Sequence, residues 1–414
     1  MHWRAPSILL ALTVGLGGCP QPNEEPLDLD HIESSERPSK RSEVIASVDE
    51  ESNSMMIFGG NEGPIVNQMP SAAYLGDTWV FEPGWGWREV VTTEAPSPRG
   101  RFATSTDTEG RRALLFGGRW REAGTMGDYD LYNDLWAFDF ETSSWSLLDD
   151  GSQDPAPAGR YYPASAWDPE ARAFYLWGGN TNANALAIQP SSELWRWTDD
   201  DGWEEVETSG SAPSSRGFYG DGYDSRRNKL LILAGQVGDF QTLAYNDFYA
   251  LDFDDFDWDR LHDGDSDGDA PSTRMHPSVL YDAERDRYLS FGGHTDIGDA
   301  NDLWTFDRSA KTWALEYEGD VFTGEGLGCL GNPSEVPAEY VDQDVTAPER
   351  RHRGMYALMY DNLWVFGGMH AECSDHLDDT WRYDLSTNTW HELIEARSGE
   401  SCARRGEDCD CLCL

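Results

Sequence analysis

Short apolar runs that end in a pair of small residues recur along the chain. In the first copy Ile57 and Phe58 precede Gly59 and Gly60, and the same pattern returns five more times. The second residues of these pairs are 60, 118, 179, 235, 293 and 368, so successive copies lie 58, 61, 56, 58 and 75 residues apart. A near-constant period of this kind is typical of repeat architectures in which each copy is one supersecondary unit.

Three further marks accompany each apolar run in a fixed order. A Pro-x-x-Arg sequence stands before the run, and an acidic residue followed two positions later by an aromatic residue stands after it. A second tryptophan follows eight or nine residues later. Turn-forming stretches such as Asp168-Pro169-Glu170 and Asp307 to Ala310 separate the segments within a unit. Each unit therefore predicts four short antiparallel strands.

The four marks resemble the kelch repeat, and the resemblance extends from Pro38 to Leu393. It implies an all-β fold, a six-bladed kelch-type β-propeller of four-stranded antiparallel blades. Unit four departs from the pattern with Ala234 in place of the first glycine and Tyr249 in place of tryptophan. Every unit is complete from its first strand to its last, so we expect complete blades, with the termini docking as extra strands at most. Leu29 to Ile32 and the stretch after Arg405 are the alternatives for a shared closing strand.

Composition excludes several classes of partner. The 414 residues include 31 Lys and Arg against 76 Asp and Glu, a formal net charge of -45. Nucleic-acid binding is excluded, because it requires clustered basic side chains, and so is a basic contact with anionic lipid. Hydrophobic residues at 39% and aromatic residues at 12% are sufficient for a core, so the acidity does not indicate a disordered chain.

The first 19 residues are typical of an export signal. Arg4 precedes an apolar run from Ala5 to Leu16, which is shorter than the about 20 residues needed to span a bilayer. The run ends in Leu16-Gly17-Gly18-Cys19, which resembles the lipobox of bacterial lipoproteins and implies lipid attachment at Cys19. We expect an exported protein, anchored by lipid in the bacterial cell envelope and facing the periplasm or the cell exterior. An ordinary signal peptide with an incidental cysteine is the alternative.

These features divide the chain into four parts. Residues 1–19 are the expected lipoprotein signal peptide, and residues 20–37 an acidic tether. The propeller covers 38–397 with an insertion at 316–347, and residues 398–414 form a cysteine-rich tail.

The connections differ in length between the two ends of the predicted blades. Those from strand two to strand three and from unit to unit are long and emerge at the same end, which we call the long-loop face. Long loops on a rigid scaffold usually carry binding, so this face is the candidate site for a protein or glycan ligand. The resemblance supports this choice, because related kelch modules contact partners there. Three loop aromatics offer stacking surfaces: Tyr74, Trp120 and Tyr129.

The Pro-x-x-Arg arginines stand where the innermost strand of each blade begins, so we expect them around the mouth of the central channel. One interpretation is a basic collar that binds a carboxylate or another anion bidentately. The other is that each arginine pairs with an acid or carbonyl of a neighbouring blade. The six residues are Arg41, Arg99, Arg160, Arg216, Arg274 and Arg351.

An enzymatic alternative follows from the same resemblance. Some kelch proteins resemble galactose oxidase, in which His and Tyr hold copper and one Tyr is cross-linked to Cys. No cysteine lies between Cys19 and Cys329, so the first five units cannot supply that cross-link. Five histidines in the last two units suit copper or zinc but lack the spacing of a compact metal motif. They are His276, His294, His352, His370 and His376.

The acidic stretch 263–269 fits the first half of a calcium loop, with Gly268 at the sixth position. Its twelfth position is Arg274 instead of Glu, so a solvated acidic loop is the alternative to a calcium site. The candidate ligands are Asp263, Asp265, Asp267 and Asp269.

The cysteines other than Cys19 form an even set, which in an oxidising compartment indicates disulfides. Two of them, Cys329 and Cys373, fall on the long-loop face, where a bond would pin the insertion. The set is Cys329, Cys373, Cys402, Cys409, Cys411 and Cys413.

Together these observations predict a lipid-anchored kelch propeller that binds a protein or glycan and has no catalytic activity of its own. Two alternatives stay open: a kelch-fold oxidase or isomerase acting on sugars at the channel mouth, and a structural protein of the envelope.

Overall fold

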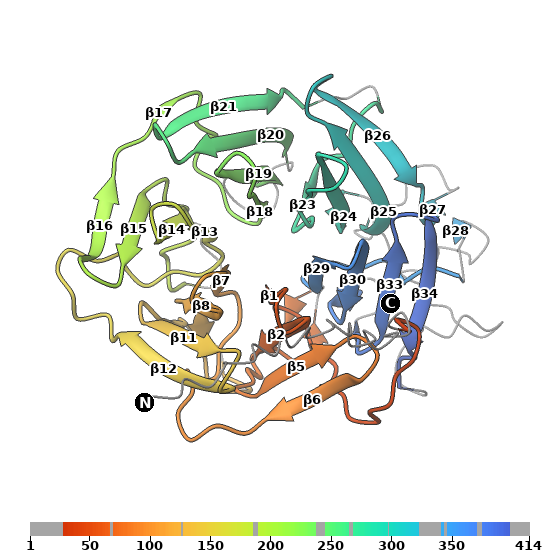
Figure 1. Ribbon diagram of the computed structural model, residues 1–414, viewed down its shortest axis with the longest axis horizontal. Coiled ribbons are helices and arrows are strands. Elements are labelled where there is room, and N and C mark those ends of the chain that lie inside the picture. The colour runs from red at the N-terminus through yellow and green to blue at the C-terminus, as the bar shows by residue number, and fades with distance from the viewer. Residues whose placement is uncertain are drawn as a thin grey trace, which may run out of the picture.

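The computed structural model consists of six β-sheets arranged around a central axis (Figure 1). It describes residues 28–66, 69–125, 127–184, 189–236, 245–264, 268–296, 298–322, 341–342, 346–370 and 375–397. Across these ranges the chain forms no helix. The described residues therefore contain no helix that is long and apolar enough to cross a membrane. The expected six-bladed β-propeller with antiparallel blades is confirmed.

Each blade is built from one continuous stretch of sequence, and its strands lie side by side in chain order. Blades one to three contain β1 (Ala46–Asp49), β2 (Ser54–Phe58), β5 (Thr78–Glu82) and β6 (Gly86–Val90); β7 (Ala103–Asp107), β8 (Arg112–Phe116), β11 (Leu135–Asp139) and β12 (Ser144–Asp149); β13 (Ala164–Asp168), β14 (Ala173–Trp177), β15 (Leu194–Thr198) and β16 (Gly202–Val206). Blades four to six contain β18 (Gly220–Asp224), β19 (Lys229–Gly235), β20 (Tyr245–Asp252) and β21 (Asp257–His262); β23 (Leu280–Asp282), β24 (Arg287–Thr295), β25 (Gly298–Asp307) and β26 (Thr312–Tyr317); β29 (Met355–Met359), β30 (Asn362–Phe366), β33 (Thr380–Asp384) and β34 (Thr389–Ile394).

Two blades carry a short additional strand. In blade four β17 (Ser209–Gly210) pairs in parallel with β21, and in blade five β22 (Arg274–Met275) pairs with β24. Short hairpins occupy several of the long connections: β3 (Ile65–Val66) with β4 (Met69–Pro70), β9 (Arg119–Trp120) with β10 (Asp130–Leu131), β27 (Val321–Phe322) with β28 (Val341–Asp342), and β31 (Met369–His370) with β32 (Asp375–His376).

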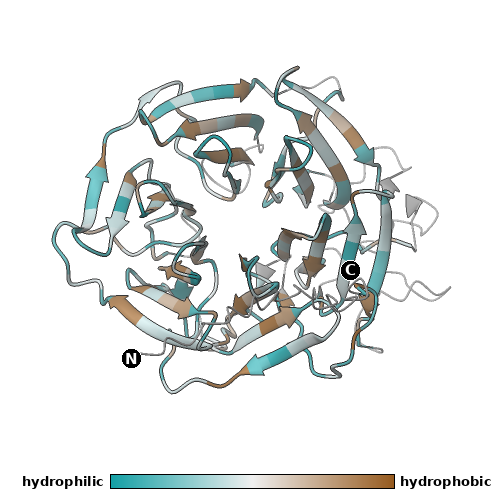
Figure 2. Ribbon diagram, in the orientation of Figure 1, coloured by the Kyte–Doolittle hydropathy of each residue, from teal (hydrophilic) through white to brown (hydrophobic). Residues whose placement is uncertain are grey.

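The apolar runs become the second strand of each blade because neighbouring blades cover both of its faces. All five residues of β14 and of β30 are buried, which accounts for a continuous apolar run where an exposed strand would alternate. The outermost strands alternate instead, as in β12, and in Figure 2 the strands β6 and β16 are largely hydrophilic. The blade interiors therefore form the core, and the outermost strands form the solvated rim.

In blades one to three the last tryptophan of the unit is hydrogen-bonded to the blade before it. The indole nitrogen of Trp145 in blade two donates to Thr78 Oγ1 of blade one at 2.9 Å, and that of Trp203 donates to Asp149 Oδ2 at 3.0 Å. Trp87 makes the equivalent contact across the closing junction, to Thr380 Oγ1 at 3.0 Å. These rings bury large apolar surfaces between successive sheets while satisfying their single polar group.

The glycine pairs also connect blades. Gly59 has a φ of 56°, and a Cβ there would lie 2.5 Å from the carbonyl oxygen of Arg99 in the next blade. The amide of Gly60 donates to that same oxygen at 3.0 Å. A side chain at this position would push adjacent blades apart, so the glycine is a requirement of packing.

The ring closes by contact between complete blades, as expected from the repeat count. The amide of Gly368 donates to the carbonyl oxygen of Arg41 at 2.9 Å, repeating across the last junction the bond found between other neighbours. Residues 28–37, which the sequence assigned to the acidic tether, pack along this junction. Leu29 and Ile32 contact the apolar cluster shared by blades one and six, and Arg382 donates to Asp30 Oδ1 at 2.8 Å.

Candidate functional site at the channel mouth

Each blade contains one hydrogen-bonded triad made from its repeated arginine, acid and aromatic residue. In blade one Arg41 donates to the two carboxylate oxygens of Asp77 at 2.7 and 2.8 Å, and the Trp79 indole donates to Asp77 Oδ2 at 2.7 Å. Arg41 also donates to the carbonyl oxygens of Ser39 and Gly59. The other pairs are Arg99–Asp134, Arg160–Glu193, Arg216–Asp247, Arg274–Asp302 and Arg351–Asp379.

This arrangement corrects the interpretation of the six arginines as a ligand-binding collar. Each is at most 1% exposed, and its donors are already engaged by the carboxylate and carbonyl oxygens of its own blade. Burial raises the pKa of Asp379, but the paired Arg351 outweighs it and leaves that pKa below its usual range, so the pair stays charged. The arginines are therefore paired within the protein, as in the second interpretation, but each pairs with an acid of its own blade and not of a neighbouring blade. The triads are scaffold.

A second ring of six side chains lies two residues beyond these arginines, and of its members the sequence analysis had singled out only His276, for another role. Every member is a non-glycine residue with φ between 54° and 64°. Such left-handed backbone is costly for side chains with a Cβ and often marks functional positions. We call this set the axial ring: Glu43, Arg101, Tyr162, Phe218, His276 and Arg353.

The left-handed backbone lets successive blades bond to each other around the channel. The amide of Glu43 donates to the carbonyl oxygen of Arg353 at 2.8 Å, which joins blade one to blade six. Tyr162 donates in the same way to Arg101 at 2.6 Å, and His276 to Phe218 at 2.7 Å. The side chains meet near the axis, where the rings of Tyr162 and His276 have centroids 4.6 Å apart. The axial ring thus forms a layer across the channel just inside the long-loop face.

Three arginines share one carboxylate in this layer. Glu43 Oε1 accepts from Arg101 Nε at 2.6 Å and lies 3.6 Å from Arg119 Nη2 and 4.0 Å from Arg353 Nη1. All four side chains are buried. Burial raises the pKa of Glu43, but the three guanidinium groups outweigh it and lower that pKa to about 2. The cluster therefore carries two positive charges in excess, inside a protein whose net charge is -45.

Two of the three loop aromatics singled out from the sequence cover this cluster. The guanidinium of Arg119 lies 3.9 Å from the ring centroid of Tyr129, and its Nε donates to the hydroxyl of Tyr74 at 2.9 Å. Arg121 stacks on the same Tyr129 ring at 4.3 Å. Trp120 lies half-buried between these arginines on the β9–β10 hairpin.

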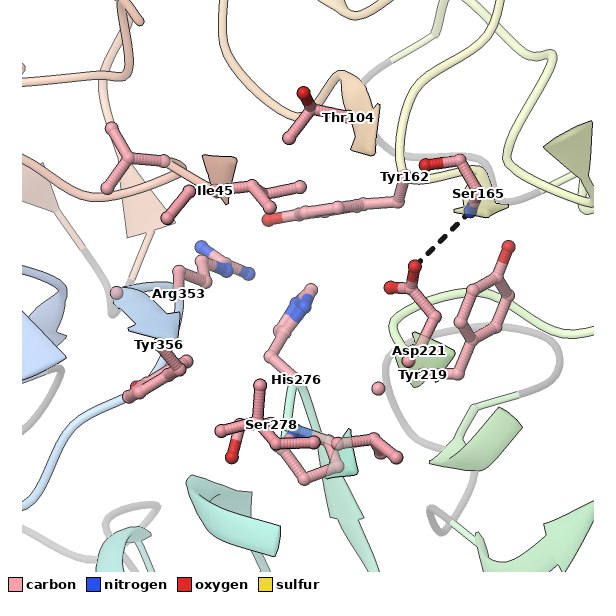
Figure 3. Close-up of a pocket in the computed structure, with 18 of the residues that line it drawn as sticks. Ile45, Thr104, Tyr162, Ser165, Tyr219, Asp221, His276, Ser278, Arg353 and Tyr356 are labelled. Atoms are coloured by element: carbon pink, nitrogen blue, oxygen red, sulfur yellow. Dashed lines mark hydrogen bonds between the residues drawn. The ribbon is translucent and has the colours of Figure 1, made fainter. Parts of the chain in front are cut away.

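Below the axial ring the channel widens into a cavity of about 330 Å³ (Figure 3). Its wall is formed by the innermost strands and by axial-ring residues such as Arg353 and His276. Several buried polar atoms of this wall have no hydrogen-bond partner among the described residues, which indicates a polar space able to hold ordered water or a small polar ligand. They include Tyr162 Oη, Ser165 Oγ, His276 Nε2 and Tyr356 Oη.

Asp221 is an acidic group of this cavity wall that, unlike Glu43, has no arginine paired with it among the described residues. Its Oδ2 accepts from the amide of Ser165 at 3.3 Å, the dashed line in Figure 3. Burial raises the pKa of Asp221 to about 7, only partly offset by that hydrogen bond. Its carboxyl therefore changes charge near neutral pH.

The five candidate histidines of the last two units lie in different environments. His276 belongs to the axial ring, and His376 Nε2 lies 2.8 Å from the carbonyl oxygen of Gly63. His294 and His352 converge on Asp299, which the sequence analysis did not identify. Burial lowers the pKa of His352 to about 4, despite the opposing effect of Asp299, so its imidazole is neutral at pH 7. His370 Nδ1 lies 3.7 Å from Glu349 Oε2.

Other predicted site residues lie largely outside the described ranges. This applies to Cys19, to Asp265 and Asp267 of the candidate calcium loop, and to all six disulfide candidates. Asp263 and Asp269 are exposed, and Asp263 lies 3.4 Å from Arg260.

Comparison with known proteins identifies relatives that match most of the chain. The family model described as the KLHDC2/KLHL20/DRC7 Kelch-repeats domain matches residues 29–172 and 164–326, and the Kelch motif matches 357–393. A Drosophila melanogaster protein named leucine-zipper-like transcriptional regulator 1 homolog is 23% identical over 81% of this chain and 30% of its own length. Kelch domain-containing protein 2 of Bos taurus is 23% identical over 74% of this chain and 72% of its own. The chain thus spans less than a third of the fly relative and most of the bovine one.

Proposed function

Because the chain belongs to the kelch-repeat family, we propose that it is a protein-interaction module that binds its partner through the long-loop face. The supporting observation is the basic cluster of Arg101, Arg119 and Arg353 around the single carboxylate of Glu43. A buried excess of positive charge raises the potential at the face above it and favours the approach of acidic groups. The partner segment that we propose is therefore acidic.

The β9–β10 hairpin is the part of this face best placed to contact a partner. It presents the half-buried side chains of Trp120 and Arg121, and the Arg121 guanidinium donates to the carbonyl oxygen of Gly127 at 2.8 Å. Tryptophan and arginine are the residue types most often found at the energetic centre of protein interfaces. They lie directly outside the buried cluster, because Arg121 stacks on the Tyr129 ring that also covers Arg119.

A protein ligand fits this surface better than a glycan. The Tyr129 ring already stacks on two guanidinium groups, and Tyr74 packs edge-on against it with centroids 6.4 Å apart. Sugar binding generally needs an aromatic face that is free to stack, and these two rings are engaged. Glycan binding and sugar chemistry at the mouth thus have less support than a protein contact, and we propose a module without catalytic activity.

The structural-protein alternative gains support only from the triads. Their six arginines are internally paired and account for the rigidity of the blades. The basic cluster is a separate set: Glu43 also links blades one, two and six, but one carboxylate leaves two of its three arginine charges without an equal number of acids.

We further propose that the module is exported and anchored by lipid at Cys19, because the apolar run and lipobox-like ending precede the propeller. One acyl chain anchors only marginally, whereas several chains on one cysteine hold a protein stably at a membrane.

Site-specific photo-crosslinking tests the binding face. A photoreactive amino acid replaces Trp120 on the long-loop face or, as the control, Tyr360, which is exposed at the turn between β29 and β30. Illumination of cell-envelope fractions should yield a discrete crosslinked protein from position 120 and none from position 360. Arg121→Glu should abolish that product, whereas Arg172→Glu, an equal charge change on the opposite face, should leave it intact. Identical products from both positions, or a product insensitive to Arg121→Glu, would refute the assignment.

A further inference from the structure

Two imidazoles and one carboxylate converge where blades five and six meet at the long-loop face. His294 Nδ1 lies 2.7 Å from Asp299 Oδ1, and His352 Nδ1 lies 2.8 Å from the same oxygen. One ligand atom from each residue falls within 4.8 Å of the other two. Asp299 and His352 are buried, and the His294 side chain is 19% exposed.

The backbone holds the three residues in fixed relative positions. His294 and Asp299 are cross-strand partners on β24 and β25, and Thr295 Oγ1 donates to the carbonyl oxygen of Gly298 at 2.7 Å to close the turn between them. The neighbouring residues complete the arrangement, because Arg351 donates its amide to the carbonyl oxygen of Ala300 at 3.0 Å and Gly293 donates to that of Arg351 at 3.1 Å. A site held this firmly is organised before any ligand arrives.

The two imidazoles approach the Asp299 carboxylate differently, because His294 Nδ1 is hydrogen-bonded to Oδ1. His352 Nδ1 lies 2.8 Å from Asp299 Oδ1 at an angle outside hydrogen-bonding geometry, and no other group of the described residues bonds to this nitrogen. A metal ion bound beside Asp299 would satisfy the His352 nitrogen and would replace the hydrogen bond of His294.

A neighbouring histidine adds a second observation. His276 is 7% exposed, and its Nε2 has no hydrogen-bond partner among the described residues. Its ring lies beside that of His352, with centroids 5.8 Å apart and planes 22° from parallel. A buried imidazole nitrogen without a partner is costly unless water or an ion satisfies it.

The position that His294 occupies in blade five varies across the repeat, with Arg119, Gln236 and Met369 in blades two, four and six. The residue after the second small residue of each unit lies at the base of the loop between strands two and three, and in blades one and three it is an asparagine. Asn61 Oδ1 accepts from the amides of Gly63 and Ala73, and Asn180 has the same role in its own loop. Blade five instead places an imidazole there and a carboxylate opposite it. Blade five therefore combines an imidazole with a carboxylate at a position where the repeat tolerates different side chains.

We propose that His294, Asp299 and His352 form a binding site for one divalent first-row transition-metal ion, of which Zn²⁺ is the representative. Two imidazole nitrogens and one carboxylate oxygen are a common protein ligand set for such ions, and three protein ligands leave a position for water or a partner's group. The site goes beyond the proposed interaction function and does not depend on it. It joins residues of blades five and six, so a bound ion links the two blades at the face where the partner is proposed to bind.

Metal titration of the full chain tests the site. The protein is stripped with a chelator, its thiols are blocked with iodoacetamide so that cysteines cannot bind metal, and Zn²⁺ is added in a calorimeter. We expect one equivalent to bind, with affinity lowered at least about 100-fold by Asp299→Asn and by His294→Gln. Co²⁺ at the same site should give visible d–d absorption that both substitutions abolish.

A matched control is available on the outer strand of blade six. His391 Nδ1 lies 3.2 Å from Asp30 Oδ1, but Arg382 pairs with that carboxylate at 2.6 Å, and His391 belongs to no group of three candidate metal ligands among the described residues. His391→Gln should therefore leave Zn²⁺ binding unchanged. Circular dichroism confirms that each variant is folded, and His294→Gln, at the partly exposed position, retains the fold most readily. Absence of Zn²⁺ binding by the wild-type chain, or equal binding by wild type and both site variants, would overturn the proposal in favour of a hydrogen-bonded group.

Discussion

Asp221 gives the propeller a stability that depends on pH near neutrality, and Asp221→Asn isolates this effect. Burial in the channel wall raises the pKa of Asp221 from 3.8 to about 7. Between these pH values the folded protein keeps a proton on this carboxyl while the unfolded chain has lost it. Folding stability contributed by Asp221 therefore falls as pH rises from about 4 to about 7. Asparagine has the same shape and still accepts from the Ser165 amide, but it carries no charge at any pH.

The magnitude follows from the two pKa values. A tenfold change in proton affinity corresponds to about 1.4 kcal/mol, so the full difference amounts to about 4 kcal/mol above neutral pH. Water in the adjoining cavity solvates part of the charge, because Asp221 is only half-buried. We therefore expect Asp221→Asn to exceed wild type in unfolding free energy by about 1–3 kcal/mol at about pH 8, and to match it at about pH 4.

Denaturant unfolding followed by tryptophan fluorescence at several pH values measures this difference, since the chain has 18 tryptophans. Asp200→Asn, an exposed position on the turn between β15 and β16, serves as the control and should show no pH-dependent difference from wild type. A constant difference across the pH range, or a variant less stable than wild type at about pH 8, would refute the assignment of a buried, costly charge to Asp221.

Three further predictions test the scaffold and the anchor. Ala234 adopts a φ of 63° where other blades have glycine, so Ala234→Gly should raise the unfolding free energy by about 0.5–1 kcal/mol, and a loss of stability would contradict this. Arg351→Met leaves the Asp379 carboxylate buried without its partner and should lower the unfolding free energy by about 3–5 kcal/mol. Adding Asp379→Asn should recover part of this loss, and thermal unfolding measures both changes. A loss under about 1 kcal/mol would show that the triad is dispensable. Cys19→Ser should move the protein from the detergent phase to the aqueous phase on Triton X-114 partitioning, whereas unchanged partitioning would exclude the lipid anchor.

The fold was predictable because its determinants are repeated. Six copies of an apolar run, a glycine pair and two aromatic positions defined the four strands of every blade, and the structure confirms them. Even the departure at Ala234 fits, because its backbone adopts the left-handed conformation that its glycine counterparts have. Packing between blades requires small and aromatic residues at the same positions of every unit. These residues therefore recur six times and can be recognised in a single sequence.

The site was less predictable for two physical reasons. The sequence displays the arginine and the acid of each triad, but their separation varies from 28 residues in Arg274–Asp302 to 36 in Arg41–Asp77, so spacing alone does not pair them. The axial ring is hidden more deeply, because its members share a backbone conformation and no chemical character. Only the fixed offset of two residues from each repeated arginine marks it.

The offset also bears on how this protein acquires specificity. Phe218, Arg353 and Glu43 adopt nearly the same backbone although one is apolar, one basic and one acidic. The neighbouring blades fix the main chain at these six places and leave the choice of side chain open. The side chains that line the channel mouth therefore differ from blade to blade and meet one another across the axis, whereas every triad keeps an arginine, an acid and an aromatic residue.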